Sequence, residues 1–410
     1  MRRDWEVISR ELQKRVQDRL DLSREQSDQE VLALIDEEIL KKSGENYLLL
    51  DEKLRIRKEL FNSMRRLDIL QELIEDPDVT EIMVNGPRDI FVERGGRLTR
   101  WEGCFSSREK LEDVVQQMVS FCNRSISKAR PIADARLTDG SRVNIVLDPV
   151  ALNGPVVTIR RFPKEPIRMR QLLEWGSISP EAVSFLQKAV QAGYNIFVSG
   201  GTGSGKTTAL NALSEFIPMD ERIITIEDNA ELQLDRVENL VTLEARSANL
   251  EGEREITIRD LIKTSLRMRP DRIIVGEIRG AEAIDMLQAM NTGHDGSLST
   301  GHANSPADML SRLETMVLMG MELPLTAVRR QIASGLDLIV HLGRVRDGSR
   351  KILEIVEIEG MDRDEIRLRT LFSFEEEKGK EKTAKVVGQL QKKADLLHTE
   401  KLRAAGIGGL

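Results

Sequence analysis

The residues with the clearest chemical signature lie in the glycine-rich segment 200–208, which reads GGTGSGKTT and matches the pattern GxxxxGK[ST]. Glycines let closely spaced backbone N–H groups surround an anion, and the positive end of a following helix favours negative charge there. Lys206 adds a charge for the β- and γ-phosphates, and the Thr207 hydroxyl suits Mg²⁺. The predicted nucleotide-binding residues are Gly200, Gly201, Thr202, Gly203, Ser204, Gly205, Lys206, Thr207 and Thr208.

Hydrolysis of a bound nucleotide also needs acidic residues that hold the metal and orient water, and two apolar runs end in such residues. The run RIIVGE ends in Glu277, which we expect to bind Mg²⁺ through water, although Gly276 stands where many P-loop enzymes carry aspartate. The run IITIED ends in Glu227 and Asp228, and Glu227 is the predicted general base. The alternative is that these carboxylates are solvated acids or helix caps.

Two of the four histidines, His294 and His302, fall in the glycine-rich stretch that follows. They are eight residues apart with no cysteine nearby, which is a poor arrangement for zinc, so phosphate sensing is favoured over metal binding. A hydrogen-bonded structural role is the alternative for each, and it is the role expected for His341 and His398. The predicted catalytic residues are therefore Lys206, Glu227, Glu277 and His302.

Apolar runs alternate with helical stretches through the second half of the chain, which is typical of a buried, mostly parallel α/β sheet. These runs lie at 195–199, 222–227, 239–244, 272–277 and 338–342. The glycine-rich segment follows the first run and precedes an amphipathic helix, as a phosphate-binding loop requires.

The rest of the chain divides by composition. Ile8, Leu12, Val16 and Leu20 recur every fourth residue, which predicts a helix with one apolar face. Short alternating runs with Asn-Gly and Gly-Gly turns follow, typical of antiparallel strands. The predicted organisation is a helical segment (1–72), an α+β domain (73–162), a linker marked by Pro163 and Pro166 (163–180), a P-loop α/β domain (181–374), and a charged loop with a short helical tail (375–410).

Composition excludes several classes of protein. The 410 residues are 40% hydrophobic and 31% charged, which indicates a globular protein, and the net charge of −7 argues against general affinity for nucleic acid. The start of the chain lacks the apolar core of a signal peptide, and no apolar run is long enough to span a membrane, so we expect a cytoplasmic protein. Cys104 and Cys122 form neither a CxxC pair nor a metal-ligand set.

The motifs, in their order along the chain, resemble those of the type II/type IV secretion ATPases. Their Walker A, Asp, Walker B and His boxes are matched by residues 200–208, 225–232, 269–280 and 293–304. Three further segments resemble the CpaF-type branch, whose members drive Tad/Flp pili: 79–98, 129–162 and 396–407. The resemblance spans about 75–410, and the zinc module of many type II motors, with its paired CxxC motifs, is missing.

This resemblance implies a RecA-like P-loop domain preceded by the α+β domain, and a homo-hexameric ring that uses ATP and Mg²⁺. It implies that arginines of the smaller domain close over the phosphates, with Arg160 and Arg161 as the candidates. Arg130, Arg136 and Arg142 either line the same cleft or form a solvated basic edge. The implied partners are inner-membrane platform proteins, through which the ring associates with the inner face of the membrane.

The predicted function is therefore an ATP-hydrolysing motor for assembly of a Tad/Flp-type pilus, working by in-line attack of water on the γ-phosphate. One alternative is a type IV secretion ATPase that exports DNA or protein effectors. A second is a nucleotide-binding scaffold that does not hydrolyse ATP. A nucleic-acid motor is disfavoured by the acidic balance of the chain.

Overall fold

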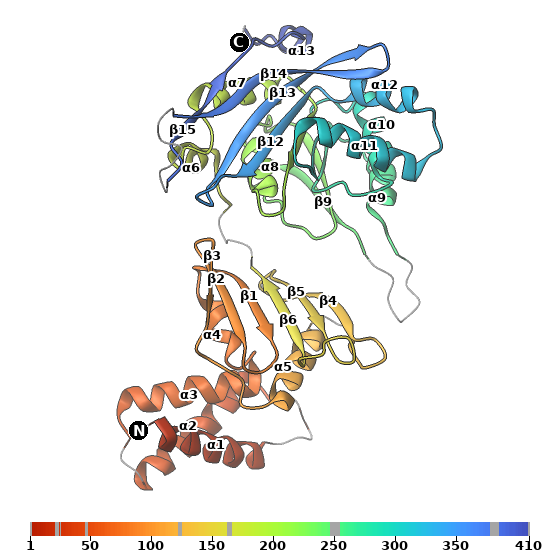
Figure 1. Cartoon of the computed structure of the whole chain (residues 1–410). Helices are drawn as coiled ribbons and strands as arrows, with labels where there is room; N and C mark the ends of the chain where they lie inside the picture. The colour runs from red at the N-terminus through yellow and green to blue at the C-terminus, as the bar shows by residue number, and fades with distance from the viewer. Residues whose placement is uncertain are drawn as a thin grey trace. The chain divides into compact units, whose positions relative to one another are not determined.

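The computed structural model of the chain describes residues 2–20, 24, 26–45, 48–121, 125–161, 166–246, 255–377 and 385–408. Cys122, Pro163 and residues 378–384 of the charged segment lie outside the described residues. The chain divides into two compact units, Met1–Lys164 and Glu165–Leu410, and each is described by itself (Figure 1). No helix in the described part of the chain is long and apolar enough to cross a membrane.

The smaller unit begins with a three-helix bundle. Leu12 and Val16 of the predicted apolar stripe are fully buried, and Ile8 and Leu20 pack against the same core. That core is completed by apolar residues of the next two helices, so the stripe packs within its own bundle. The helices of this unit are α1 (Arg2–Arg19), α2 (Asp28–Glu45), α3 (Leu50–Arg65), α4 (Leu70–Glu75) and α5 (Arg108–Phe121).

A six-stranded antiparallel sheet with the order β3-β2-β1-β6-β5-β4 forms the rest of the smaller unit. Successive residues of a strand point to opposite faces, so Ile82 and Val84 enter the core with α5, while Glu81 and Met83 lie on the other face, partly exposed. The strands are β1 (Val79–Asn85), β2 (Ile90–Arg94), β3 (Arg97–Arg100), β4 (Ile132–Arg136), β5 (Arg142–Val146) and β6 (Val156–Arg160).

The larger unit is built on a nine-stranded sheet with the order β15-β14-β13-β12-β7-β11-β10-β8-β9. The six strands from β12 to β9 are parallel, and β13, β14 and β15 add an antiparallel edge. The apolar runs predict five of the six parallel strands and miss β11, whose sequence LSTGH is not a continuous apolar run. The strands are β7 (Ile196–Gly200), β8 (Arg222–Glu227), β9 (Asn239–Glu244), β10 (Arg272–Val275), β11 (Leu298–His302), β12 (Leu338–Arg344), β13 (Arg350–Asp362), β14 (Glu365–Glu376) and β15 (Gly388–Lys392).

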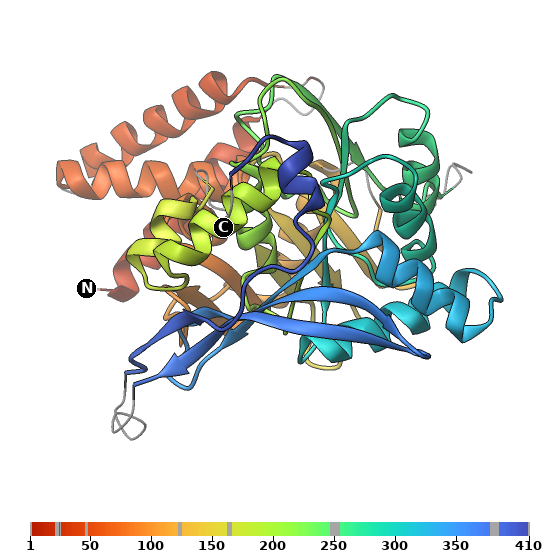
Figure 2. The same cartoon turned by 90° about the horizontal axis from the view of Figure 1, so that it is seen from above.

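Helices cover both faces of this sheet (Figure 1, Figure 2). Ile196 and Val198 face the core shared with α6, α7, α8 and α13, whereas Phe197 between them faces the core shared with α9 to α12. Burial on both faces explains why β7, β8, β10 and β12 are largely apolar. The helices are α6 (Met169–Glu174), α7 (Pro180–Gln191), α8 (Lys206–Ser214), α9 (Ile258–Ser265), α10 (Ala283–Asn291), α11 (Pro306–Gly320), α12 (Leu325–Gly335) and α13 (Glu400–Ala404).

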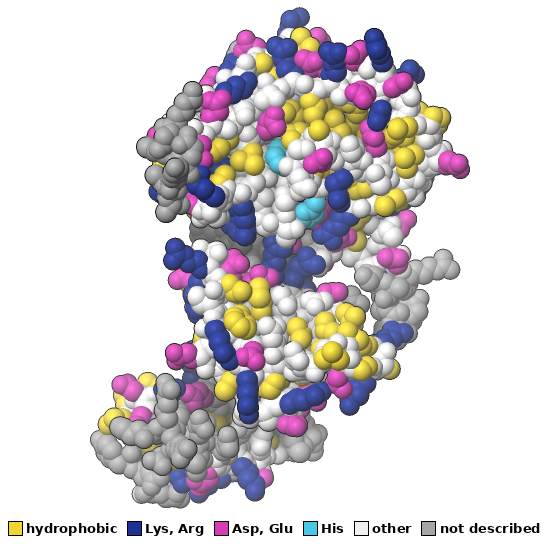
Figure 3. Space-filling view, viewed as in Figure 1, with side chains coloured by type: hydrophobic (Ala, Val, Ile, Leu, Met, Phe, Trp, Pro, Cys, Tyr) yellow, Lys and Arg dark blue, Asp and Glu magenta, His cyan; other side chains and the backbone are white. Residues whose placement is uncertain are grey.

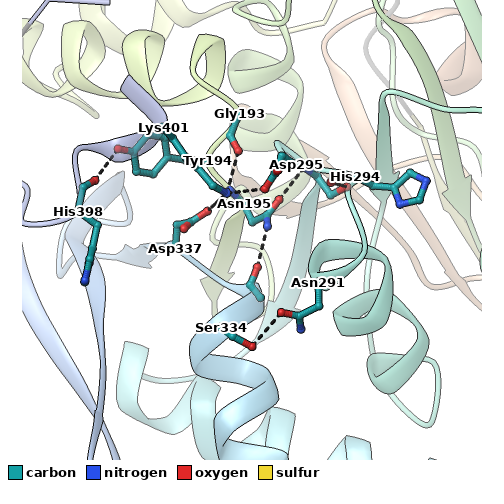
Figure 4. A network of polar contacts seen from close by, with 12 residues as sticks. Gly193, Tyr194, Asn195, Asn291, His294, Asp295, Ser334, Asp337, His398 and Lys401 are labelled. Carbon is teal, nitrogen blue, oxygen red and sulfur yellow. Dashed lines mark hydrogen bonds and ion pairs between the residues drawn. The ribbon is translucent and has the colours of Figure 1, made fainter. Parts of the chain in front are cut away.

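Ion pairs and hydrogen bonds connect the C-terminal tail to the amino ends of the central parallel strands (Figure 4). Lys401 Nζ lies 2.7 Å from both Asp337, which precedes β12, and Asp295, which precedes β11. It also donates to the carbonyl oxygen of Gly193, before β7, at 3.2 Å. The Tyr194 hydroxyl donates to the His398 carbonyl oxygen at 2.6 Å. One ammonium therefore ties together the entry points of three neighbouring strands.

Replacing Lys401 with Met is expected to lower the free energy of unfolding by about 1–2 kcal/mol, because mostly buried Asp337 loses its cation. Chemical denaturation of the full chain measures this change. Lys392→Met is the matched control, since Lys392 pairs with the exposed Asp395 and such pairs contribute about 0–1 kcal/mol. Equal stability of the two variants would contradict a fastening role for Lys401.

Candidate nucleotide site

The glycine-rich loop joins the end of β7 to the start of α8, between a buried strand and a helix, as the sequence predicts. Gly205 is the N-cap of α8 with φ of +97°, and Gly203 has φ of +66°, conformations that residues with a Cβ rarely adopt. Gly200 lets the loop approach β12, because a Cβ there would lie 2.4 Å from the Leu342 carbonyl oxygen. The loop thus leads into the first turn of a helix, whose N–H groups bind anions.

Three of the predicted catalytic residues meet beside this loop. Lys206 Nζ donates to His302 Nδ1 at 3.2 Å, and to the carbonyl oxygens of Gly200 and Gly201 at 3.2 and 3.1 Å. His302 Nε2 in turn lies 2.9 Å from Glu277 Oε1. The P-loop lysine, the His-box histidine and the carboxylate after β10 therefore form one continuous chain of polar contacts.

Arg279 extends this chain to the end of β8. Its guanidinium lies 2.6 Å from Glu277 Oε2 and 3.3 Å from Asp228 Oδ2. Sequence patterns alone assign no firm role to Asp228, and they leave Arg279 as one of several arginines near the acidic motifs. In the structure Arg279 links the carboxylates that follow two neighbouring strands, β8 and β10.

The protonation of these groups follows from their neighbours. Burial and the charge of Lys206 lower the pKa of His302, which favours a neutral ring. Because an ammonium can only donate, Nδ1 accepts from Lys206 and the ring proton sits on Nε2, on the side of Glu277. Burial raises the pKa of Glu277, but the hydrogen bond and charge of Arg279 outweigh it and hold that pKa below its usual value. Glu277 is therefore a carboxylate at neutral pH.

Glu227, the predicted general base, has a different environment. It ends β8 with only 3% of its surface exposed, and it accepts hydrogen bonds from the backbone N–H groups of Glu231 and Leu232 at 3.0 and 3.1 Å. Burial raises its pKa to about 7, against the opposing effect of these bonds. Gly276 is required beside it, because a Cβ at position 276 would lie 2.8 Å from Glu227 Cγ. An aspartate at this position would displace Glu227.

The predicted Mg²⁺ ligands have suitable chemistry. Thr207 lies in the first turn of α8, and a hydroxyl and a carboxylate oxygen are ligands that Mg²⁺ accepts, the latter commonly through water. Glu277 Oε1 is buried and, despite its closeness to His302, makes no hydrogen bond of regular geometry among the described residues. It therefore retains capacity to accept one from a metal-bound water. The assignment of Thr207 and Glu277 to Mg²⁺, and of Thr208 to nucleotide, stays a prediction.

A family profile described as "Type II/IV secretion system protein" matches residues 64–394, most of the chain. The chain belongs to the type II/IV secretion ATPase family. A Mycobacterium tuberculosis protein provisionally named as a conjugal transfer protein is 37% identical over 293 residues, covering 70% of this chain and 83% of that protein. VirB11 of the Brucella suis type IV secretion system is 35% identical over 318 residues, covering 70% of this chain and 88% of VirB11.

Two solved structures share the fold of this secretion ATPase at lower sequence identity. The Legionella pneumophila ATPase DotB has a TM-score of 0.51 at 22% identity, covering 70% of this chain and 79% of DotB. The pilus retraction motor PilT, solved with ADP, has a TM-score of 0.51 at 21% identity, covering 74% of this chain and 81% of PilT. The predicted fold class, a RecA-like ATPase domain preceded by an N-terminal α+β domain, is confirmed.

The smaller unit of the secretion ATPase carries a row of arginines across its sheet. Arg160 on β6 pairs in register with Arg142 on β5, which pairs with Arg136 on β4. Glu81 on β1 lies directly opposite Arg160, so a carboxylate borders the row at one end. Arg161 is not part of this row. Its Nη1 donates a hydrogen bond to the Val79 carbonyl oxygen of the same unit at 2.8 Å. The nucleotide-binding roles of Arg160 and Arg161 stay predictions.

Sequence reasoning missed two arginines that contact the phosphate-binding loop. The Nε atoms of Arg344 and Arg350 donate to the Gly203 carbonyl oxygen at 3.0 and 2.9 Å. The Asp347-Gly348 pair between them signals a hairpin turn, but only the strand order reveals that this hairpin borders the loop.

Replacing Glu227 with Gln is expected to change how stability depends on pH. The pKa of Glu227 is about 7 in the folded protein, against an ordinary value of 4.5. Between these two pH values the unfolded chain ionises this carboxyl while the folded protein keeps it protonated. The free energy of unfolding therefore falls as the pH rises from about 4.5 to about 7. Glutamine stays neutral at all pH values. The stability of Glu227→Gln relative to wild type should therefore rise by about 3 kcal/mol from about pH 4 to about pH 8.

Urea denaturation at a series of pH values measures this difference. Glu238→Gln is the matched control, because Glu238 is an exposed glutamate directly before β9. A difference between Glu227→Gln and wild type that is constant over this range would contradict the raised pKa of Glu227.

Proposed function

We propose that this secretion ATPase hydrolyses ATP with Mg²⁺ at the carboxyl ends of the parallel strands of its larger unit. The observation that carries the proposal is the contact of Lys206 with His302, and of His302 with Glu277, beside a phosphate-binding loop. Open α/β sheets bind ligands at this edge of the sheet. Positioning and charge stabilisation are the main contributions a protein makes to phosphoryl transfer, and this arrangement supplies both.

Each residue of the site has a role in this proposal. Lys206 and the first turn of α8 bind the phosphates, while Thr207 and Glu277 hold Mg²⁺, the latter through water. His302, neutral and hydrogen-bonded to Lys206, reports whether the lysine has moved to a phosphate. Glu227 orients the attacking water and accepts its proton, a task suited to a carboxyl whose pKa lies near the working pH.

We infer that the protein is a hexameric motor that assembles a Tad/Flp-type pilus. It is located at the inner face of the cell membrane, where platform proteins attach it, and it does not bind nucleic acid directly. The segments 79–98, 129–162 and 396–407, which resemble the CpaF-type branch, support this assignment. Apolar side chains gather over α11 and α12 (Figure 3), and such patches are typical of protein–protein contacts. Exposed apolar residues of this region are Leu318, Met319, Met321 and Leu325.

Export of DNA or protein effectors through a type IV secretion system is the second candidate. The names of two relatives favour it, one a conjugal transfer protein and the other VirB11 of a type IV secretion system. Deletion of the gene separates the two functions. Loss of surface pili that wild-type protein restores would support the pilus motor, whereas intact pili with lost transfer would support export.

Phosphate release by the purified full chain tests ATP hydrolysis. We expect Mg²⁺-dependent turnover that rises with protein concentration as the ring assembles, and a loss of at least about 100-fold in Lys206→Ala and in Glu227→Gln. Lys263→Ala is the control, because Lys263 is an α9 lysine that pairs with Asp285. Nucleotide binding without turnover would instead favour a scaffold that does not hydrolyse ATP.

The pH dependence of turnover tests the role of Glu227 separately. A general base must be deprotonated, so kcat/KM, which reports the nucleotide-free enzyme, should rise with pH through a midpoint near 7. The residual rate of Glu227→Gln should lack this rise. A wild-type rate that is flat between about pH 6 and about pH 8 would contradict Glu227 as the base.

A further inference from the structure

Two arginines of the larger unit converge on one carbonyl group of the phosphate-binding loop. Arg344 ends β12 and Arg350 begins β13, and the two residues lie directly opposite each other in the antiparallel ladder. The Nε atom of each donates to the carbonyl oxygen of Gly203, at 3.0 Å for Arg344 and 2.9 Å for Arg350. A carbonyl oxygen has two lone pairs, so both bonds form together.

These bonds complete the restraint on one peptide group. The carbonyl of the Gly203–Ser204 peptide accepts from the arginines, and its N–H donates to the Gly201 carbonyl oxygen at 3.3 Å. The peptide is planar, so holding both ends fixes its orientation. Gly203 has φ of +66°, and a Cβ there would lie 2.7 Å from Arg344 Nη2. The guanidinium thus packs directly against the loop backbone.

The hairpin of β12 and β13, which carries the two arginines, is itself held in place by contacts with its neighbours. β12 runs parallel to β7, with Leu342 paired to Gly200 at the start of the loop. The Ser177 hydroxyl donates to the Arg350 carbonyl oxygen at 2.8 Å. Asp347, in the turn between the strands, accepts from the backbone N–H of Ser349 at 2.9 Å. The hairpin is therefore held against the same strand that carries the loop.

We propose that Arg344 and Arg350 are positioning residues of the nucleotide site, which hold the Gly203–Ser204 peptide in the orientation in which the loop binds phosphate. This inference rests on the proposed function. The two guanidinium groups also place positive charge beside the loop. A polyphosphate bound by the loop is attracted by that charge. The pair therefore favours the nucleotide-bound protein over the free one.

The test compares Arg344→Gln, Arg350→Gln and the double variant in the full chain. Equilibrium binding of a fluorescent ATP analogue with Mg²⁺ gives Kd, and phosphate release gives KM and kcat. Loss of a charged hydrogen bond predicts about tenfold weaker binding in each single variant, with KM rising more than kcat falls. Arg344→Lys and Arg350→Lys, which keep a charged donor, should recover part of the affinity.

Arg346→Gln is the matched control, because Arg346 belongs to the same hairpin but pairs with Glu376. Binding is measured well below the melting temperature of each variant, so that loss of folded protein does not enter Kd. Glutamine variants that bind ATP as tightly as Arg346→Gln would overturn the inference. Wild-type protein that fails to bind ATP would instead overturn the proposed function.

Discussion

The register between β7 and β11 is the constraint on which the site depends. His302 at the end of β11 lies directly opposite Gly200 at the end of β7, where the phosphate-binding loop begins. That pairing brings the imidazole within 3.2 Å of Lys206, although 96 residues separate them in the chain. The next strand, β10, then presents Glu277 to the other side of the ring. A shift of one residue in this ladder would turn His302 to the other face of the sheet and break the chain of contacts.

The two ends of the parallel strands differ in how their polar groups are satisfied. At the amino ends, Lys401 pairs with Asp295 and Asp337, so charged groups are balanced within the chain. At the carboxyl ends, the buried Ser204 hydroxyl and Glu277 Oε1 make no hydrogen bonds of regular geometry among the described residues. Buried polar atoms without partners are costly, and a ligand that satisfies them recovers that cost on binding. The contrast supports a fixed edge at one end of the sheet and a ligand-binding edge at the other.

Much of this arrangement could be predicted from the sequence, because it follows from local patterns. Buried parallel strands are continuous apolar runs, and the loop has a glycine pattern that few other structures need. Lys206 and Glu277 are recognisable as residues at or near the ends of such runs, and His302 by its place with His294 in a glycine-rich segment. The contacts of Arg344 and Arg350 with Gly203 could not be found, because they depend on which strand borders β7. The burial of Glu227 and its bonds to the backbone after β8 likewise depend on packing that no spacing reveals.

A structure of the full chain with Mg²⁺ and a slowly hydrolysed ATP analogue tests ATP binding at this loop most directly. We expect the β- and γ-phosphates to lie at the loop, and Lys206 to leave the carbonyl oxygens of Gly200 and Gly201 and contact them. Glu277 should then face the hydrated metal, within reach of His302. Nucleotide bound elsewhere, or Lys206 still held by the two carbonyl oxygens with the analogue present, would contradict the proposed site.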